Sequence, residues 1–555
     1  MKSNSSVTND DKKLGNWFAG VPYSGEWLFL AVCLVSAFLI RFLALPQNSI
    51  INGDGIFYAT LGSRFISGDF ERGLSAYWSP LYSSLVGIFH LFFQDLELSG
   101  RAVSLVTGSL LIIPSYVLIR TFFGRVAANI GTVLVVVHPS LIVSSTWVMT
   151  ESTYTLLFTS GVVGGWLALE SGKKLAYLFT GLLFGAAFLT KPESIGFAGL
   201  FLLLAFVIKL AWSRSEIKKL PAAFLVFAAG FSIFSLPYIV FIHQKTGRWT
   251  ISQKLVSNST FEGSERGLLK VTDDRWTTMQ DRIWWDDYDA EKREPKAETQ
   301  SSSGSFAAQN RQGDVPTFLS RSASNLIRQV RHYVPEMFPV LFILIGAVGF
   351  LAKPWNIDRV AKEIYLLFFV TCMFLGYAVT VIELRYLYPL IPICLGWVGL
   401  GCAAVGRYLS HLGRRWRLKP VFVYVFLLLA LAFSLIPLFF HNLKDPQMDL
   451  LPFEEKNAGL WLKHNSEPSS VVMSRNATVA FYAGAAHIFL PDEELPTILE
   501  YARKKRVNYI VLSERRLRQR SDLFRSMEGA VEDLTPVYED DSFKDFKVKI
   551  FAINQ

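Results

Sequence analysis

The sequence has few charged residues for its length. Asp, Glu, Lys and Arg make up 18% of the 555 residues, whereas an ordinary soluble protein carries about 25%. Hydrophobic residues make up 51%, and Phe alone occurs 45 times. This composition excludes a disordered chain, a coiled coil and a soluble enzyme built on one domain.

Cysteine is also scarce. The four cysteines, Cys33, Cys372, Cys394 and Cys402, all lie in apolar runs. Their spacing fits neither a metal site nor a disulfide framework. We expect them to be buried packing residues.

The charges that are present divide the chain into two parts. Residues 441–555 hold 16 basic and 18 acidic side chains, a density typical of a soluble domain. Residues 1–440 hold 39 basic and 28 acidic side chains spread over four times the length. We therefore predict a cytoplasmic N-terminal tail at 1–25, a membrane domain at 26–440 and a soluble domain at 441–555.

The membrane domain contains many apolar runs of the length needed to cross a bilayer, about 20 residues. We count about eleven: 26–45, 102–119, 126–143, 152–169, 175–190, 194–212, 220–242, 336–352, 363–381, 386–406 and 421–440. A further apolar stretch at 80–93 is short for a span. The fold class predicted is an α-helical polytopic membrane protein with a small soluble α/β domain.

Orientation follows from the basic residues of the short loops, which favour the cytoplasm. If 80–93 lies on the membrane surface, every strongly basic short loop falls on one side, including Lys173 with Lys174 and Lys218 with Lys219. The positive net charge of +9 is thus explained by membrane topology and requires no nucleic-acid partner.

Three segments are then predicted to lie outside the cytoplasm: the first loop at 46–101, a second large loop at 243–335, and the soluble tail. Within the second loop, 290–315 is polar and rich in Ser and Gly, which indicates a flexible insert.

The tail alternates helix and strand patterns, which indicates a small α/β domain. We predict helices over 453–465 and 494–506. Strands are predicted over 469–474, 507–513 and 546–554.

Ionisable residues gather at the predicted outer ends of the spans, where burial in lipid would be costly. They are Asp54, Glu151, Lys191, Glu193, Glu383 and Arg385. Each also has a purely structural interpretation. Asp54 between two glycines fits a turn or helix N-cap, and Glu151 fits a first-turn carboxylate favoured by the helix dipole.

The basic residues have structural interpretations as well. Arg41 and Lys191 fit the pattern of side chains that reach from a helix end to the membrane surface. Arg385 and Glu383 fit a local surface ion pair. Only the convergence of carboxylates and cations on one face favours a functional site.

Several stretches, taken in order, resemble the bacterial glycosyltransferase 39-like proteins, which have the GT-C fold. They are DGIFYATLGSRFISGDF with WSPLYSSLVGIFHLFF, RTFFGRVAANIGTVLVVVHPSLIVSSTWVMTES, LTKPES and ELRYLYPLIP. This family includes protein mannosyltransferases and lipid A aminoarabinose transferases. The tail resembles the periplasmic domain that some members carry.

The resemblance implies transfer of a sugar from a polyprenyl-phosphate donor to a lipid, glycan or protein acceptor outside the cytoplasm, in a bacterial inner membrane. Asp54 matches the acidic residue of the first loop, Glu151 the acidic position at the fourth span, and Arg385 a basic position where lipid phosphate binds. Lys191, Tyr58, Glu193 and Tyr386, in the matching stretches, are further candidates for binding substrate or lipid phosphate.

The sequence departs from the family pattern in two places. Gly55 follows Asp54 where many members have adjacent Asp-Glu, and Ser79-Pro80 stands where some have Lys-Pro. The resemblance therefore implies no certain cofactor and leaves the use of a divalent metal open.

The residue types suit an inverting displacement. Asp54 would accept the proton of the acceptor hydroxyl, and Arg385, or secondly Lys191, would stabilise the leaving phosphate. Glu151 would position the acceptor or tune Asp54. Two other classes remain: a transporter or flippase of lipid-linked sugars, and a non-catalytic scaffold for envelope assembly.

Overall fold

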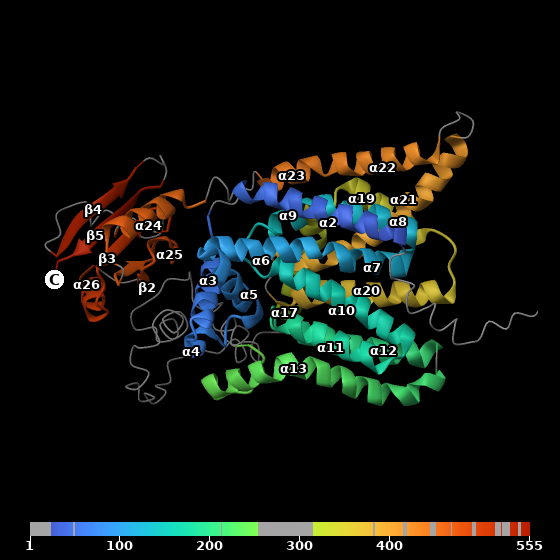
Figure 1. Ribbon diagram of the computed structural model, residues 1–555, viewed down its shortest axis with the longest axis horizontal. Helices are drawn as coiled ribbons and strands as arrows, with labels where there is room; N and C mark the ends of the chain where they lie inside the picture. Colours follow the sequence, from blue (N-terminus) through green and yellow to red (C-terminus); the bar gives the residue numbers. More distant parts are fainter. Residues whose placement is uncertain are drawn as a thin grey trace, which may run out of the picture.

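The computed structural model describes twelve parts of the chain. They are residues 24–47, 50–212, 214–252, 315–380, 383–413, 419–443, 451–467, 469–490, 495–516, 523, 533–541 and 546–554. A large helical bundle is followed by a small domain that contains a sheet (Figure 1). The insert predicted at 290–315 lies outside the described residues except for Val315.

The N-terminal half of the bundle consists of helices joined by short turns. They are α2 (Ser24–Ala44), η1 (Leu45–Gln47), α3 (Gly53–Ile66), α4 (Phe70–Gly73), α5 (Pro80–Phe93), α6 (Leu96–Leu110), α7 (Ile112–Phe123), α8 (Arg125–Val137), α9 (Pro139–Ser144), α10 (Glu151–Ser171), α11 (Lys174–Phe188), α12 (Ser194–Trp212), η2 (Arg214–Lys219) and α13 (Leu220–Thr246).

The structure describes the chain again from Val315, inside the segment predicted as the second large loop. The helices of this part are α17 (Val315–Arg328), η3 (Gln329–Tyr333), α18 (Val334–Met337), α19 (Val340–Leu351), α20 (Ile357–Ala378), η4 (Leu384–Leu390), α21 (Ile391–Gly413), α22 (Pro420–Ser434) and α23 (Ile436–Leu443).

Seven helical stretches among the described residues are long and apolar enough to cross a bilayer, and a bent helix pair would make an eighth. They are Gly25–Ala44, Leu96–Phe123, Ser194–Trp212, Arg214–Thr246, Ile357–Ala378, Leu384–His411 and Pro420–Phe440, with the pair Leu319–Met337 and Val340–Leu351 bent by 102°. The chain is therefore a multi-pass membrane protein, as predicted. The count of eleven stays a prediction, because α8 and α11 have only 13 and 15 residues.

Helices α3 and α5 lie across one end of the bundle, next to the small domain, whereas the long helices run roughly parallel to one another (Figure 1). A Cβ added to Gly62 would lie 2.5 Å from the Ser83 carbonyl oxygen, and one added to Gly87 would lie 2.4 Å from the Gly62 carbonyl oxygen. Only glycine permits this close crossing of backbones. The crossing fixes α3, whose first turn carries Asp54.

The small domain has a five-stranded sheet in the order β2-β1-β3-β5-β4. Its elements are α24 (Phe453–Asn465), β1 (Val471–Ser474), α25 (Thr478–Ala483), β2 (Ala486–Phe489), α26 (Leu495–Lys504), β3 (Tyr509–Ser513), β4 (Leu534–Asp540) and β5 (Val548–Ile553). Strands β2, β1 and β3 are parallel, and β5 runs antiparallel to both β3 and β4. The predicted α/β class is confirmed, and α25, β2 and β4 are additional to the predicted elements.

Candidate active site

Glu151 is the first residue of helix α10, and Arg385 links it to Asp54 of α3. The Glu151 side chain is only 2% exposed, yet it lies between two cations. Lys191 Nζ donates a hydrogen bond to Glu151 Oε1 at 3.2 Å, and Arg385 Nε lies 3.6 Å from the same oxygen. Because a buried carboxylate without partners is costly, these two cations explain how Glu151 can be charged there.

Asp54 lies in the first turn of α3, with its side chain 38% exposed. The N-cap of this helix is Asn52, whose side-chain oxygen accepts from Gly55 N at 2.7 Å. The N-cap role considered for Asp54 is therefore wrong, and its carboxylate is available to other partners. Arg385 Nη2 donates to Asp54 Oδ2 at 3.3 Å.

Gly55 explains one departure from the family pattern. A Cβ at this position would lie 2.7 Å from both Asn52 Oδ1 and the Val148 carbonyl oxygen. The backbone of the segment before α10 thus packs directly against the first turn of α3. A second acidic side chain next to Asp54 does not fit this packing.

Arg385 joins the carboxylates of three separate segments. Besides Asp54 and Glu151, it donates to Glu383 of its own segment, whose side chain is 44% exposed. The guanidinium is planar and presents five donors, so one arginine can serve several oxygens at once. Three carboxylates and two cations, Arg385 and Lys191, therefore share one cluster.

Aromatic rings hold the cations from the side. Lys191 Nζ lies 4.8 Å from the ring centroid of Tyr386 and 5.5 Å from that of Tyr154. Tyr386 stacks on Tyr377 at 5.2 Å, and the Tyr377 hydroxyl donates to Glu193 Oε1 at 2.9 Å. Glu193 is thus connected to the cluster through Tyr377 and Tyr386.

Tyr58 is buried beside the carboxylates, against the rings of Trp78 and Tyr82 at 5.1 and 5.3 Å. Burial, reinforced by the negative charges of Asp54 and Glu151, holds the pKa of its hydroxyl well above the ordinary value. The hydroxyl therefore stays protonated and is a hydrogen-bond donor rather than a base.

The structure brings all seven predicted site residues to one end of the bundle. Successive ion pairs connect Asp54, Arg385, Glu151 and Lys191. Tyr386 and Glu193 adjoin them through the ring contacts above, and Tyr58 interacts with the charges of Asp54 and Glu151. Sequence reasoning missed Tyr154 and Tyr377. Both lie in apolar helical runs, where a tyrosine gives no signal beyond ordinary packing.

Arg41 has a structural role in the same region. It is fully buried, donates to Ser145 Oγ at 3.2 Å, and donates to the carbonyl oxygen of Val136 at 3.3 Å. The prediction that it reaches to the membrane surface is wrong. Pro139 cannot donate to a carbonyl of the preceding turn, and Arg41 binds carbonyls freed at that break.

The small domain contacts the backbone that leads into α3. Tyr482 accepts from Ile51 N at 3.0 Å and donates to Glu97 Oε2 at 2.9 Å. Burial and the charge of Glu97 raise the pKa of the Tyr482 hydroxyl, so it keeps the proton it donates. Lys456 Nζ lies 3.9 Å from Glu97 Oε2 and 4.8 Å from the centroid of the Tyr482 ring. The domain thus restrains the chain three residues before Asp54.

We expect Tyr482→Phe to loosen this restraint. Loss of the hydroxyl leaves Ile51 N–H without its acceptor, an effect of about 1–3 kcal/mol. Amide exchange of Ile51, followed by mass spectrometry in deuterated buffer, should accelerate by about 5- to 150-fold. Tyr509→Phe, a change within the domain's own sheet, is the matched control and should leave the exchange of Ile51 unchanged. Equal exchange in wild type and Tyr482→Phe would show that the contact does not hold this segment.

No cluster of three or more His, Cys, Asp or Glu suited to a metal ion occurs in the described parts of the chain. The three carboxylates of the site instead face the two cations.

Solved structures show which fold this chain has. ArnT from Cupriavidus metallidurans, determined with undecaprenyl phosphate bound, has a TM-score of 0.57 at 14% identity, over 95% of this chain and 98% of that chain. An oligosaccharyltransferase from Archaeoglobus fulgidus has a TM-score of 0.58 at 18% identity, over 88% of this chain and 69% of that chain. The protein therefore has the GT-C fold of membrane glycosyltransferases.

A family model matches part of the chain. Residues 78–239 match the dolichyl-phosphate-mannose-protein mannosyltransferase family. Arabinofuranosyltransferase AftD from Mycobacteria is also similar, with a TM-score of 0.51 at 12% identity, over 97% of this chain and 40% of that chain. Among curated proteins, none matches this sequence. The predicted resemblance to GT-C glycosyltransferases is confirmed.

Proposed function

We propose that the protein is a glycosyltransferase that moves a sugar from a polyprenyl-phosphate donor to an acceptor outside the cytoplasm. The observation that carries this proposal is the position of Arg385, in contact with Asp54 and Glu151 at one end of the bundle. Structures with this fold have been determined with undecaprenyl phosphate and with dolichol-phosphate bound, which supports a lipid-linked donor.

The reaction is a single displacement at the anomeric carbon. The acceptor hydroxyl oxygen attacks this carbon while its proton passes to the Asp54 carboxylate. The bond between the anomeric carbon and the phosphate oxygen breaks, and its electron pair stays on the leaving polyprenyl phosphate. One displacement inverts the anomeric configuration. Asp54 suits the role of base because its carboxylate is partly exposed, whereas that of Glu151 is buried between cations.

Arg385 and Lys191 would stabilise the charge on the leaving phosphate. Arg385 already binds the exposed carboxylate of Glu383. A phosphate presents the same kind of acceptor oxygens, so it would take the place of Glu383 on the guanidinium. Lys191 is held by Glu151 and by the rings of Tyr386 and Tyr154, which fixes its position.

An apolar groove supports a lipid carrier as donor. It has a volume of about 380 Å³, lies between α18–α19 and α20–α21, and is lined among others by Phe342, Leu367 and Leu390. Leu390 ends η4, the segment that carries Arg385. A polyprenyl tail in this groove would therefore continue from a phosphate held by Arg385.

The two other classes are less well supported. A transporter would place ionisable groups near the bilayer midplane, whereas Asp54, Glu151 and Arg385 lie at helix ends. A scaffold requires no such cluster.

We further propose a bacterial inner membrane as the location, with the site and the small domain on the periplasmic side. The basic loops at the opposite end of the bundle support this orientation.

Mass spectrometry of envelope glycoconjugates from a deletion strain tests the proposal. We expect one conjugate to lose a sugar and the corresponding polyprenyl-phosphate sugar to accumulate. The accumulated donor, extracted and added to purified protein, should release polyprenyl phosphate and restore the conjugate. Unchanged envelope conjugates would contradict a transferase role. A donor that accumulates only in the inner leaflet would support a flippase instead.

A further inference from the structure

A cavity of about 770 Å³ lies at the end of the bundle opposite the candidate active site. It is formed where α10 ends, α11 begins, α12 ends and η2 leads into α13. Glu151 is the first residue of α10 and Ser171 is the last. At a rise of about 1.5 Å per residue, these 21 residues separate the two sites by about 30 Å, the thickness of a bilayer core.

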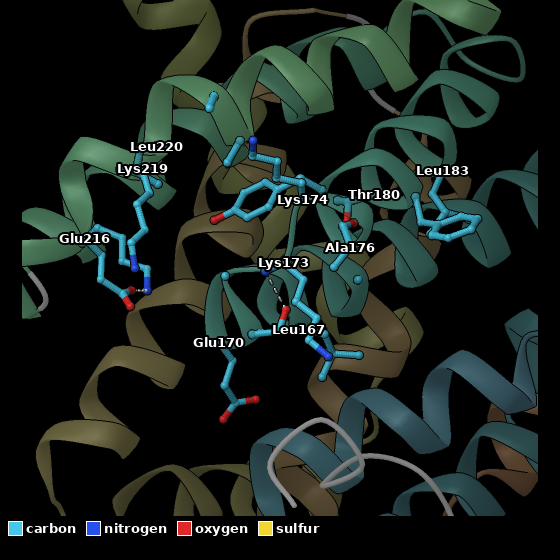
Figure 2. Close-up of a pocket in the computed structure, with 18 residues that line it drawn as sticks. Leu167, Glu170, Lys173, Lys174, Ala176, Thr180, Leu183, Glu216, Lys219 and Leu220 are labelled. Atoms are coloured by element: carbon cyan, nitrogen blue, oxygen red, sulfur yellow. Dashed lines mark hydrogen bonds and ion pairs between the residues drawn. The ribbon is translucent and has the colours of Figure 1, made fainter. Parts of the chain in front are cut away.

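Charged side chains surround the cavity. The lining includes four lysines, Lys173, Lys174, Lys209 and Lys219, and two glutamates. Figure 2 shows Lys173 and Lys174 at the start of α11, and Lys219 with Glu216 on η2. One pair is internal, because Lys209 is buried and binds Glu216. The remaining lining charges, three lysines and one glutamate, give the cavity an excess of two positive charges.

Most of the other lining residues are apolar, with Ser171 and Thr180 as exceptions. Leu167, Leu183 and Leu220 contribute to it from three different helices. Phe179 also lines it, and with a relative exposure of 56% on a helix of a membrane bundle it lies at the lipid-facing surface. A free anion would gain nothing from these side chains. A phospholipid would bury an acyl chain against them.

We propose that this cavity binds an anionic phospholipid of the leaflet opposite the active site. The phosphate group would lie among Lys173, Lys174 and Lys219, and an acyl chain would lie along Phe179 and Leu183. Basic pockets between transmembrane helices at the cytoplasmic side bind acidic lipid headgroups in this way. The basic loops place this end of the bundle in the leaflet predicted to be cytoplasmic. The cavity volume also fits a lipid headgroup with part of a chain.

The proposal is independent of the transferase activity. It assigns a second lipid site, distinct in position and chemistry from the one proposed for the donor. In the cavity, lysines outnumber acidic residues by four to two. In the cluster around Arg385, carboxylates outnumber cations by three to two.

Lipid titration of the purified full chain in detergent, followed by native mass spectrometry, tests this site. The probes are phosphatidylglycerol, phosphatidylcholine and inorganic phosphate. We expect phosphatidylglycerol to bind most tightly. The double variant Lys173→Gln with Lys174→Gln should raise its Kd by about 10- to 30-fold, since each basic group near a lipid surface contributes about 1 kcal/mol.

A matched double variant removes equal charge at the same membrane end but outside the cavity: Lys218→Gln with Lys419→Gln, both exposed. It should leave the Kd unchanged. Equal losses in the two double variants would overturn the proposal, because the effect would then be general surface attraction. Binding of inorganic phosphate as tight as that of phosphatidylglycerol would overturn it too, in favour of a free anion.

A third variant tests the cavity without changing charge. Ala222 lines it from the first turn of α13 and is exposed, so Ala222→Trp fills space without disturbing the core. We expect it to weaken binding of phosphatidylglycerol several-fold. Full binding by Ala222→Trp would show that no lipid enters the cavity.

Discussion

Replacing Asp54 with asparagine should lower the rate of sugar transfer by about 10²- to 10⁴-fold, the usual effect of removing a general base. An amide of the same shape can still accept from Arg385 at 3.3 Å but cannot take a proton from the acceptor. The fold should be retained, because Asn52 and not Asp54 caps α3. The measurement is the rate of polyprenyl phosphate release by purified protein with extracted donor.

Asp69→Asn is the matched control. Asp69 is a partly exposed acidic residue in the same predicted loop as Asp54. It caps α4, and asparagine caps helices equally well. We expect wild-type turnover from this variant. Near-normal turnover by Asp54→Asn would show that another group accepts the proton.

Replacing Arg385 with glutamine should reduce transfer by about 10²- to 10³-fold, as expected when a donor to a developing negative charge is removed. Glu151 remains paired with Lys191 at 3.2 Å in this variant, so the buried carboxylate keeps one cation and the protein should fold. The affinity for undecaprenyl phosphate should fall as well, which a binding titration with that lipid measures.

Two further variants test whether the effect of Arg385→Gln is specific to the guanidinium at this position. Arg385→Lys keeps the charge but loses the planar fork that contacts three segments, so we expect partial activity. Arg248→Gln removes an exposed arginine just after α13 and should have no effect. If glutamine at 385 left both turnover and lipid affinity unchanged, the phosphate would bind elsewhere.

The sequence predicted which ionisable residues gather at one end of the bundle better than it predicted their contacts. Asp54 and Arg385 are 331 positions apart, yet both were placed by one rule, the sidedness of basic loops. That rule assigns each residue to one face of the membrane but does not give the distance between them. Contact between Tyr377 and Glu193 depends on how α20 packs against the turn before α12, which no local pattern encodes.

In the small domain, too, the sequence predicted some elements and missed others. Strands β1, β3 and β5 lie inside the sheet and have the apolar runs that predict strands. Strands β2 and β4 are the two edges. Edge strands need only one protected face and tolerate residues such as Pro536, so their pattern is weak. The prediction that Arg41 reaches the membrane surface was wrong for a related reason. Its partners are carbonyl oxygens freed by a helix break 95 residues away in the sequence.

The most direct test is an experimental structure of the purified protein with undecaprenyl phosphate. We expect the phosphate within hydrogen-bonding distance of Arg385, with Glu383 displaced from the guanidinium and Asp54 facing the open side. Phosphate bound away from this cluster, with the pair between Arg385 and Glu383 intact, would contradict the account.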